Sequence, residues 1–309
     1  MIQNAVIFAI SLFVVVKGAM LATKYSAKLA ESFRLSKYVV GFMVVAFVSI
    51  LPETLISINS AIQGIPSFGL ATLFGSNVAD LTLIFAILIF YAGRGIKIES
   101  KVLGEIDPYP IFLILPLILG LNGHYSRTDG FFLILTGAIF YYAVFRSSTY
   151  SSNTPNEGSG KWKNFAMFLF SMTLLLVGSR ITVESATALA RSLAISPVLI
   201  GMLVVGLGTT MPELFFSLKS LKSRDDGLAI GDIMGTVLAD ATIVVGIIAL
   251  ISPFNFPVGI VYVTGTFMVA SALILLKFMR SGKILSRKEG YLLLAFWICY
   301  AIIEFIANT

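Results

Sequence analysis

Apolar runs long enough to cross a bilayer recur along the whole of this chain. A helix that spans a hydrocarbon core of about 30 Å needs about 20 apolar residues. The 309 residues are 57% hydrophobic and only 12% charged, and the mean hydropathy is +0.94. Soluble domains carry roughly 25% charged residues. We therefore expect an all-α protein that forms one membrane domain in a lipid bilayer.

The apolar runs predict ten transmembrane helices. Their ranges are 3–23, 38–62, 67–93, 108–123, 129–146, 164–190, 196–220, 227–251, 256–276 and 290–307. The fourth range is short for a full crossing. The first has no basic start and no small-residue cleavage site, so we expect a retained span rather than a signal peptide. The one cysteine, Cys299, lies in the last span, where we expect it to be packed in the interior.

The basic residues are distributed very unevenly between the two sides of these spans. Eighteen of the 22 Lys and Arg residues fall on one side, whereas only Arg127, Arg180 and Arg191 fall on the other and Lys17 lies within the first span. The positive-inside rule makes the richer side cytoplasmic. We therefore expect a protein of the plasma membrane with both termini extracellular. The net charge of +6 then follows from topology, and we expect no nucleic-acid partner.

The two halves of the chain match when the sequence is shifted by 160 residues. The identical pairs are Gly41 and Gly201, Val44 and Val204, Val45 and Val205, Pro52 and Pro212, Glu53 and Glu213, Ser57 and Ser217, Ser60 and Ser220, Gly75 and Gly235, Asp80 and Asp240, and Thr82 and Thr242. Residues 1–146 and 164–309 each hold five spans, an odd number, so the second repeat must be inverted. We interpret 147–163 as a cytoplasmic linker. Inverted repeats are typical of secondary transporters, which bind their substrate near the midplane.

Polar side chains form stripes along four of the apolar spans. The second span carries Ser49, Glu53, Ser57 and Ser60, the seventh Thr209, Glu213, Ser217 and Ser220, the third Thr72, Ser76 and Asp80, and the eighth Asp232, Thr236 and Asp240. Residues three or four apart share one face of a helix. Ionisable side chains in a membrane helix face the protein interior. The four stripes are therefore expected to meet inside the protein.

The buried acids must be neutralised. A carboxylate at the bilayer centre costs roughly 2.5–3.5 kcal/mol, so Glu53, Asp80, Glu213 and Asp240 together cost on the order of 10 kcal/mol. No basic residue in the spans around them offers a salt bridge, and Lys17, in the first span, is the only remote candidate. Bound cations or protons are therefore expected, and a set of hard oxygen ligands suits Ca²⁺, which takes about 6–8 oxygens. The structural alternative is a group of protonated acids that join helices by hydrogen bonds.

A proline in each of the second and seventh spans predicts broken helices. Pro52 and Pro212 have no N–H to donate to the carbonyls of Val48 and Gly208. Broken helices at membrane depth line cavities, where freed carbonyls coordinate cations. The alternative is a simple kink in a packed helix.

At these residues the chain resembles the cation/calcium exchanger superfamily, especially prokaryotic sodium/calcium exchangers. The two alpha-repeat motifs of that family are similar to AFVSILPE with ATLFGSNVAD in the first half, and to GLGTTMPE with GDIMGTVLAD in the second. The resemblance implies ten spans in two inverted halves. It also implies exchange of Ca²⁺ for Na⁺ by alternating access, with spans one and six sliding past the site.

The resemblance also implies roles for individual residues. Glu53 and Glu213 match the central calcium ligands, with the backbone carbonyls of Ser49 and Thr209 completing that site. The positions that match the flanking sodium sites are Thr210, Ser76, Thr236 and Asp240, with the carbonyls of Ala46 and Gly206.

Several residues depart from the family pattern. Val48 replaces a glycine, and Ile50 replaces a hydroxyl residue that helps to bind sodium. Asp80 stands where relatives often have asparagine, which adds a carboxylate to the metal site. Thr72 and Asp232 replace asparagines. These changes leave an H⁺/Ca²⁺ exchanger, or one for another divalent cation, as the alternative.

Two other classes of protein share some of these features. An intramembrane aspartyl protease would pair Asp80 with Asp240, but its Gly-x-Gly-Asp run is represented here by AIGD at 229–232, and the glutamates would have no role. A cation channel would share the acids but needs no paired inverted gates. We therefore expect a transporter that is not an enzyme, has no resident cofactor and works as a monomer.

Overall fold

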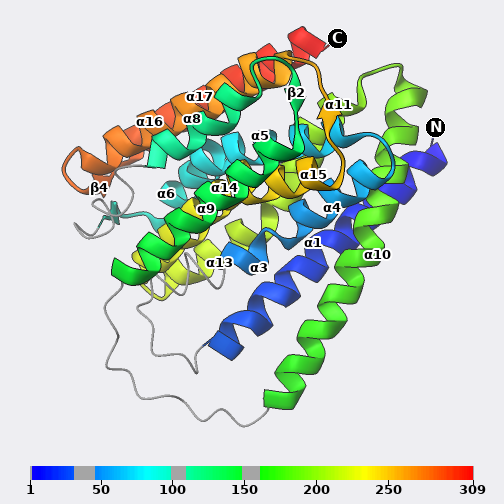
Figure 1. Cartoon of the computed structure of the whole chain (residues 1–309). Coiled ribbons are helices and arrows are strands. Elements are labelled where there is room, and N and C mark those ends of the chain that lie inside the picture. The colour runs from blue at the N-terminus through cyan, green and yellow to red at the C-terminus, as the bar shows by residue number, and fades with distance from the viewer. Residues whose placement is uncertain (1, 31–45, 99–108, 148–160, 309) are drawn as a thin grey trace.

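The computed structural model describes residues 2–30, 46–98, 109–147 and 161–308. Apart from four two-residue strands, the regular elements in these ranges are helices (Figure 1). Seven helical segments of the described chain are long and apolar enough to cross a membrane, and one apolar helix is shorter. The prediction of an all-helical membrane protein is confirmed. Residues 38–45 of the second predicted span, with Gly41, Val44 and Val45, and most of the predicted linker 147–163 lie outside the described residues.

The elements of the first half begin with a long helix and continue with shorter ones. They are α1 (Ile2–Ala30), α3 (Ala46–Ser49), α4 (Leu51–Ile62), α5 (Pro66–Ala79), the π-helix η2 (Asp80–Ile84), α6 (Phe85–Ala92), β1 (Ile96–Lys97), α8 (Tyr109–Leu119), β2 (His124–Tyr125) and α9 (Arg127–Ser147). The fourth predicted span, 108–123, is helical only over α8 within the described residues, because the chain turns at Gly120 toward β2.

The elements of the second half follow a similar order. They are α10 (Lys161–Leu193), α11 (Pro197–Ile200), η3 (Gly201–Val205), α12 (Gly206–Thr209), α13 (Met211–Lys222), α14 (Asp226–Ala239), η4 (Asp240–Val244), α15 (Val245–Ile251), β3 (Phe254–Asn255), η5 (Ile260–Gly265), α16 (Thr266–Arg280), β4 (Ile284–Leu285) and α17 (Arg287–Asn308). The bounds of α4, α5 and η2 recur 160 residues later in α13, α14 and η4. The sequence repeat is therefore also a repeat of local structure.

The helical hydrogen-bond pattern is interrupted at Ile50 and at Thr210. Pro52 stands in the first turn of α4, and Pro212 stands in the first turn of α13, where a missing N–H does least harm. The backbone at Ile50 (φ −68°, ψ −7°) and at Thr210 (φ −76°, ψ −4°) stays close to helical values. The chain therefore continues in nearly the same direction, and the interruption removes hydrogen bonds without a sharp turn.

Two small antiparallel sheets each join one half of the chain to the other. In one sheet β1 pairs with β4, with Ile96 opposite Leu285, and in the other β2 pairs with β3, with Tyr125 opposite Phe254. Because α8 connects β1 to β2, the sheets lie at opposite ends of that helix, as the labels of β4 and β2 in Figure 1 indicate.

An ion pair reinforces the end at which β1 lies. The Arg94 guanidinium donates to both carboxylate oxygens of Asp226, at 2.8 and 2.7 Å, and the amide of Lys97 donates to the same carboxylate at 2.9 Å. The hydrogen bond to Asp226 raises the pKa of the Arg94 side chain, so the guanidinium stays charged. The contact attaches the end of the first-half segment α5–α6 to the start of α14.

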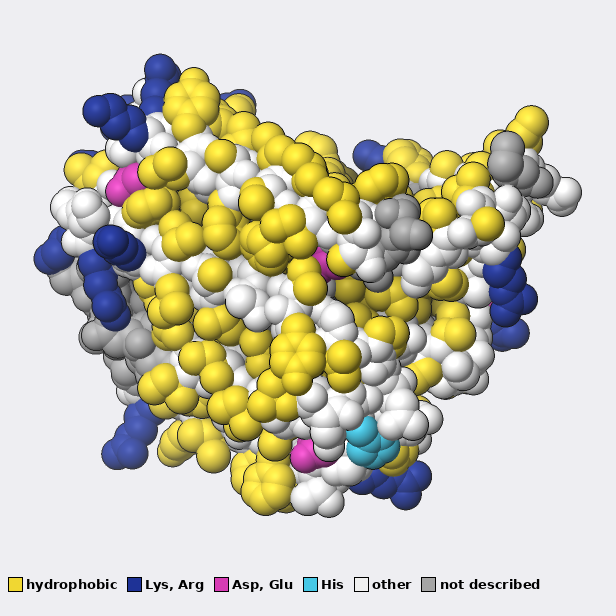
Figure 2. Space-filling model, turned by 90° about the horizontal axis from the view of Figure 1, so that it is seen from above, with side chains coloured by type: hydrophobic (Ala, Val, Ile, Leu, Met, Phe, Trp, Pro, Cys, Tyr) yellow, Lys and Arg dark blue, Asp and Glu magenta, His cyan; other side chains and the backbone are white. Residues whose placement is uncertain are grey.

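The innermost helices are α5 with η2 and α14 with η4. Nearly all of their residues are buried, whereas α1, α10 and α17 expose many large apolar side chains. Figure 2 shows apolar side chains across the middle of one face, with Lys and Arg side chains toward its two ends. This is the pattern of a membrane protein, in which the outer helices face lipid and charges lie beyond the hydrocarbon.

The packing of Cys299 differs from the prediction. Its side chain is exposed on α17, next to the exposed Ile298. The helix presents only a narrow stripe to the interior, which includes Leu293 and Tyr300. An apolar sequence alone does not separate a core-facing side from a lipid-facing side, and for that reason the prediction was wrong.

Glycines allow close contact between helices at two places. Gly18 of α1 and its repeat counterpart Gly178 of α10 pack against the opposite helix, where an added Cβ would lie 3.1 Å from Leu174 and 2.9 Å from Val15. Gly75 of α5 packs against backbone, and a Cβ there would lie 2.4 Å from the carbonyl oxygen of Met202. Small residues at such crossings let membrane helices approach each other.

We expect Gly75→Ala to destabilise the protein by about 1–3 kcal/mol, because overpacking forces backbone to move. The thermal unfolding midpoint of the purified protein in detergent measures the effect. Gly227→Ala is the matched control, since Gly227 is also in a helix and has no atom within 4 Å of the added Cβ. Equal midpoints for the two variants would contradict the close contact of α5 with η3.

Candidate cation-binding site

Each interrupted helix faces an inner helix of the other half. At the first interruption, the Ser49 hydroxyl donates to Oδ1 of Asp232 on α14, at 3.2 Å. At the second, Gly206 of α12 packs against α5, and a Cβ there would lie 3.0 Å from the backbone nitrogen of Ser76. The first contact joins α3 to α14, and the second joins α12 to α5. The two contacts are related by the repeat, because α12 is the counterpart of α3 and α5 is the counterpart of α14. The predicted polar stripes are therefore brought together at the interface of the halves.

Five acidic side chains are buried in this region. They are Glu53, Asp80, Glu213, Asp232 and Asp240, and none is more than 1% exposed. Both carboxylate oxygens of four of them, and Oδ2 of Asp232, have no hydrogen-bond partner among the described residues. Such groups are rarely left unpaired in a protein interior, because an uncompensated buried carboxylate is very costly.

Lys17, the remote candidate for neutralising the acids, lies elsewhere. Its side chain is exposed on α1, and its ammonium lies over the Phe13 ring, 5.4 Å from the ring centroid. No ion pair recorded for the described residues involves one of the five acids. Their charge is therefore not balanced by the protein in this part of the chain.

The acids act on one another through space. When ionised, Glu213 would be repelled by the carboxylates of Glu53, Asp80 and Asp232, and Asp240 would be repelled by those of Glu53 and Asp80. The carboxylates of both halves therefore form one electrostatic unit. Among the described residues, however, no three Asp, Glu, His or Cys side chains are close enough to hold a single ion together. A bound ion would take its remaining ligands from hydroxyls and backbone carbonyls.

The predicted hydroxyl ligands differ in what they already bind. Thr209 donates to the carbonyl of Gly206 at 3.1 Å and lies near the Glu53 carboxylate. Thr210 donates to Leu207, and Ser76 donates to Leu73, each within its own chain segment. A hydroxyl that donates a proton to a carbonyl keeps lone pairs for a cation. These three side chains therefore retain acceptor capacity.

Thr236 is the predicted hydroxyl ligand without a partner. Its side-chain oxygen is buried and makes no hydrogen bond within the described chain. It lies one turn from Asp232 on α14 and one turn from Asp240 at the start of η4, so the three side chains share one face.

The predicted carbonyl ligands lie at the interrupted helices. Ala46 is the first residue of α3, and Ser49 is its last. The carbonyl of Gly206, at the start of α12, already accepts from the Thr209 hydroxyl and from the Thr210 amide. It is thus less free to bind an ion than the sequence suggested. Pro52 and Pro212 cannot supply N–H groups to the preceding turn.

The outer parts of the stripes join helices instead of facing the acids. Ser57 donates to the carbonyl of Gly69 at 3.4 Å, and its repeat counterpart Ser217 donates to the carbonyl of Ala229 at 3.3 Å. Each bond connects a helix after the interruption with the next helix in its own half. The repeat of these serines therefore has a structural explanation.

Two polar residues of this region were not among the predicted ligands. Asp232 belongs to one of the predicted stripes. Its spacing from Thr236 and Asp240 is the signal that would have placed it among the predicted ligands. Asn77 is buried on α5, where its amide donates to the carbonyl of Val237 at 3.2 Å and its oxygen has no partner in the described part of the chain. Its repeat counterpart is Val237, so the repeat gave no signal for Asn77.

Comparison with protein families gives a match over nearly the whole chain. The model of the family described as sodium/calcium exchanger protein matches residues 3–146 and 163–306. The two matched segments correspond closely to the two halves that the internal repeat defines.

Individual relatives match at lower identity. The inner membrane protein YrbG of Escherichia coli is 25% identical over 82% of this chain and 81% of its own length. The membrane protein MJ0091 of Methanocaldococcus jannaschii is 28% identical over 88% of each chain. The sodium/calcium exchanger MaX1 of Methanosarcina acetivorans is 23% identical over 98% of each chain. A solved structure of the sodium-calcium exchanger NCX_Mj has a TM-score of 0.74 and 24% identity, and the match covers 100% of this chain and 99% of that one. It has the same fold.

Unbalanced buried carboxylates predict that cations stabilise the protein. A cation that binds only the folded state, at 100 times its dissociation constant, contributes about 2.7 kcal/mol. We therefore expect the thermal midpoint in detergent to rise with added Ca²⁺ or Na⁺. Choline chloride at equal ionic strength is the control, because choline is too large for a site of buried oxygens. An identical rise with choline would show that salt acts on the surface alone.

Proposed function

The chain belongs to the sodium/calcium exchanger protein family, and from this premise we propose that it is a secondary antiporter that exchanges Ca²⁺ for Na⁺ through a carboxylate site near the midplane. The observation that carries the proposal is the set of buried carboxylates without partners at the interface of the two halves. A transporter of this type needs such groups, since they bind a cation in place of water. The solved NCX_Mj structures support the fold, and MaX1 carries the name of a sodium/calcium exchanger.

In this proposal Ca²⁺ occupies a central site between the halves. Glu53 and Glu213 supply carboxylates, and the carbonyls of Ser49 and Thr209 supply further oxygens. Ca²⁺ accepts both ligand types and takes about 6–8 of them. The two glutamates lie after repeat-related interruptions and repel each other, so a divalent cation between them would relieve that repulsion.

Flanking sites would bind the monovalent counter-ions. The proposed ligands are the side chains of Ser76, Asp80, Thr210, Thr236 and Asp240, with the carbonyls of Ala46 and Gly206. Because these sites share the same electrostatic unit as Glu53 and Glu213, Ca²⁺ and Na⁺ compete for one set of charges. An empty cluster of negative charges is too costly to reorient, so the competition would enforce exchange.

The two halves are proposed to be inverted repeats, 1–146 and 164–309, joined by the linker 147–163. The small sheets support an inversion. The sheet of β1 and β4 and the sheet of β2 and β3 each pair non-equivalent strands of the two halves, and β4 is the repeat counterpart of β2. A two-fold axis in the membrane plane would exchange the two sheets and place one on each side.

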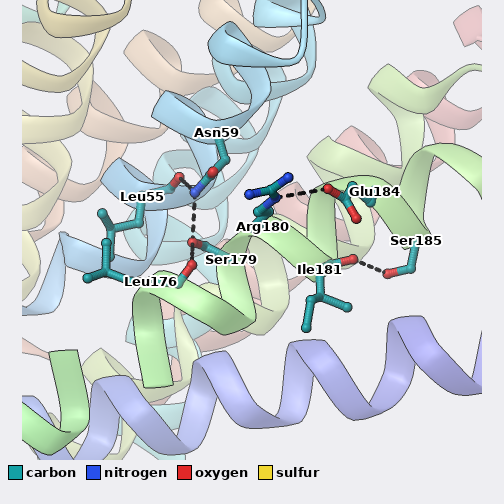
Figure 3. A network of polar contacts seen from close by, with 8 residues as sticks. All are labelled: Leu55, Asn59, Leu176, Ser179, Arg180, Ile181, Glu184 and Ser185. Atoms are coloured by element: carbon teal, nitrogen blue, oxygen red, sulfur yellow. Dashed lines mark hydrogen bonds and ion pairs between the residues drawn. The ribbon is translucent and has the colours of Figure 1, made fainter. Parts of the chain in front are cut away.

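We propose that α1 and α10 form the moving part of alternating access. The two helices pack along each other through Gly18 and Gly178. Figure 3 shows the polar contact of α10 with α4, in which the Asn59 amide donates to the Ser179 hydroxyl at 2.9 Å and to the Leu55 carbonyl at 2.8 Å. In this proposal the contact breaks and re-forms as α10 slides past α4.

We propose a location in the plasma membrane as a monomer, with both termini outside. The distribution of Lys and Arg supports this orientation. The transported ions are Ca²⁺ and Na⁺, with H⁺ as the alternative counter-ion because Asp80 adds a carboxylate. In an exchanger Glu53 and Glu213 would bind the transported cation, whereas an aspartyl protease would give these two residues no role.

The test is calcium uptake into liposomes that contain the purified protein. An outward Na⁺ gradient is expected to drive uptake of radioactive Ca²⁺, and Glu53→Gln or Glu213→Gln is expected to reduce it to the level of empty liposomes. Glu184→Gln is the control, since Glu184 is an exposed carboxylate of α10 paired with Arg180 at 3.1 Å (Figure 3).

Near-normal flux in either glutamate variant would overturn the proposed site. Uptake driven by an outward proton gradient and not by sodium would assign the protein to the proton-coupled alternative.

A further inference from the structure

The two halves differ at a position next to the carboxylate cluster. Asp232 of α14 corresponds to Thr72 of α5. The Thr72 hydroxyl donates to the Phe68 carbonyl of its own helix, at 2.9 Å. Asp232 is fully buried, accepts from the Ser49 hydroxyl through Oδ1, and has no partner for Oδ2 within the described residues. A polar group that is satisfied in the first half is thus replaced by an unsatisfied charge in the second.

The two interrupted helices also differ, and here the first half lacks a polar side chain that the second half has. Thr210 at the second interruption carries a hydroxyl, whereas its counterpart at the first interruption, Ile50, carries none and is buried. Ile50 directly follows Ser49, the residue that contacts Asp232. The first interruption therefore lacks one side-chain oxygen and gains a carboxylate from the helix packed against it.

Other polar groups belong to the segments on either side of the contact between Asp232 and Ser49. The Thr236 hydroxyl lies one turn along the same face of α14 and is also buried without a partner in the described chain. The carbonyls of the interrupted segment 46–49 lie across the contact that Ser49 makes. Tyr141, from α9, donates to the Gly235 carbonyl at 2.7 Å. At the contact of α3 with α14, the Asp232 carboxylate thus lies together with neutral oxygens.

We propose that Asp232, with Thr236 and the backbone at Ser49, forms a monovalent-cation site at the first interruption, where it supplies the oxygen that Ile50 lacks. The proposal rests on the proposed function, because it names a ligand set within the same transport site. One carboxylate with neutral oxygens balances a single positive charge. Ca²⁺ would need a second charge and about 6–8 oxygens. The ion is therefore Na⁺ rather than Ca²⁺.

The alternative is that Asp232 only ties α14 to α3 through the Ser49 hydrogen bond. Asp232→Asn distinguishes an ion ligand from a purely structural hydrogen-bond acceptor. An asparagine oxygen still accepts from Ser49, but the charge is lost. Asp232→Thr is a second variant that copies Thr72 of the first half, and it keeps the test decisive if the asparagine variant does not fold. Glu184→Gln removes an exposed carboxylate and is the matched control.

The measurement is the thermal midpoint of the purified protein in detergent as Na⁺ and, separately, Ca²⁺ is added. We expect Asp232→Asn to raise the Na⁺ concentration for half-maximal stabilisation by about tenfold or more, as loss of a metal-site partner does elsewhere. The Ca²⁺ concentration for half-maximal stabilisation should stay within about threefold of the wild-type value. Glu184→Gln should change neither the Na⁺ nor the Ca²⁺ concentration for half-maximal stabilisation. Adding Ile50→Thr to Asp232→Asn should recover part of the Na⁺ response.

An unchanged Na⁺ response in both Asp232 variants would overturn the proposal and leave a structural hydrogen bond. A loss of Ca²⁺ response equal to the loss of Na⁺ response would overturn the monovalent assignment, and no recovery with Ile50→Thr would overturn the compensation. Because this readout is binding, a wild-type protein that binds Na⁺ but moves no Ca²⁺ would refute the proposed function alone.

Discussion

Five buried carboxylates without a balancing charge are the constraint on which the rest of the structure depends. Asp80, Asp232 and Asp240 lie in the innermost helices, and Glu53 and Glu213 are buried on the interrupted helices beside them. In the described chain only Oδ1 of Asp232, which accepts from the Ser49 hydroxyl, has a hydrogen-bond donor, and their other carboxylate oxygens have none. A protein can keep such groups only if bound cations or protons neutralise them. The proposed cation site would meet this requirement.

The surrounding architecture holds these groups while leaving their oxygens open. The interruptions at Ile50 and Thr210 come shortly before Glu53 and Glu213, and the prolines that follow cannot donate an N–H to the preceding turn. Gly75 and Gly206 bring the second interruption against the backbone of α5. Serines that are not needed at the site, Ser57 among them, connect neighbouring helices. Within one stripe, the acids are thus the proposed ligands, whereas serines farther along it hold neighbouring helices together.

Much of this arrangement could be predicted from sequence, because charge inside an apolar helix is a strong signal. The burial of Glu53 and Glu213 followed from their stripes, and the interruptions followed from the prolines. The small sheets could not be predicted, since each pairs two-residue segments that are distant along the chain. The exposure of Cys299 could not be predicted either, because lipid and protein core favour the same residues. Asp232 was underestimated because its equivalent in the other half is the neutral Thr72.

The central claim is that a cation binds at the interface of the two halves. Anomalous diffraction from crystals soaked in Sr²⁺, a heavier substitute for Ca²⁺, locates such an ion directly. The account predicts a peak between the carboxylates of Glu53 and Glu213, which disappears in a Glu213→Gln crystal. Strong Sr²⁺ peaks confined to the surface of well-ordered crystals, with none between the two glutamates, would contradict it.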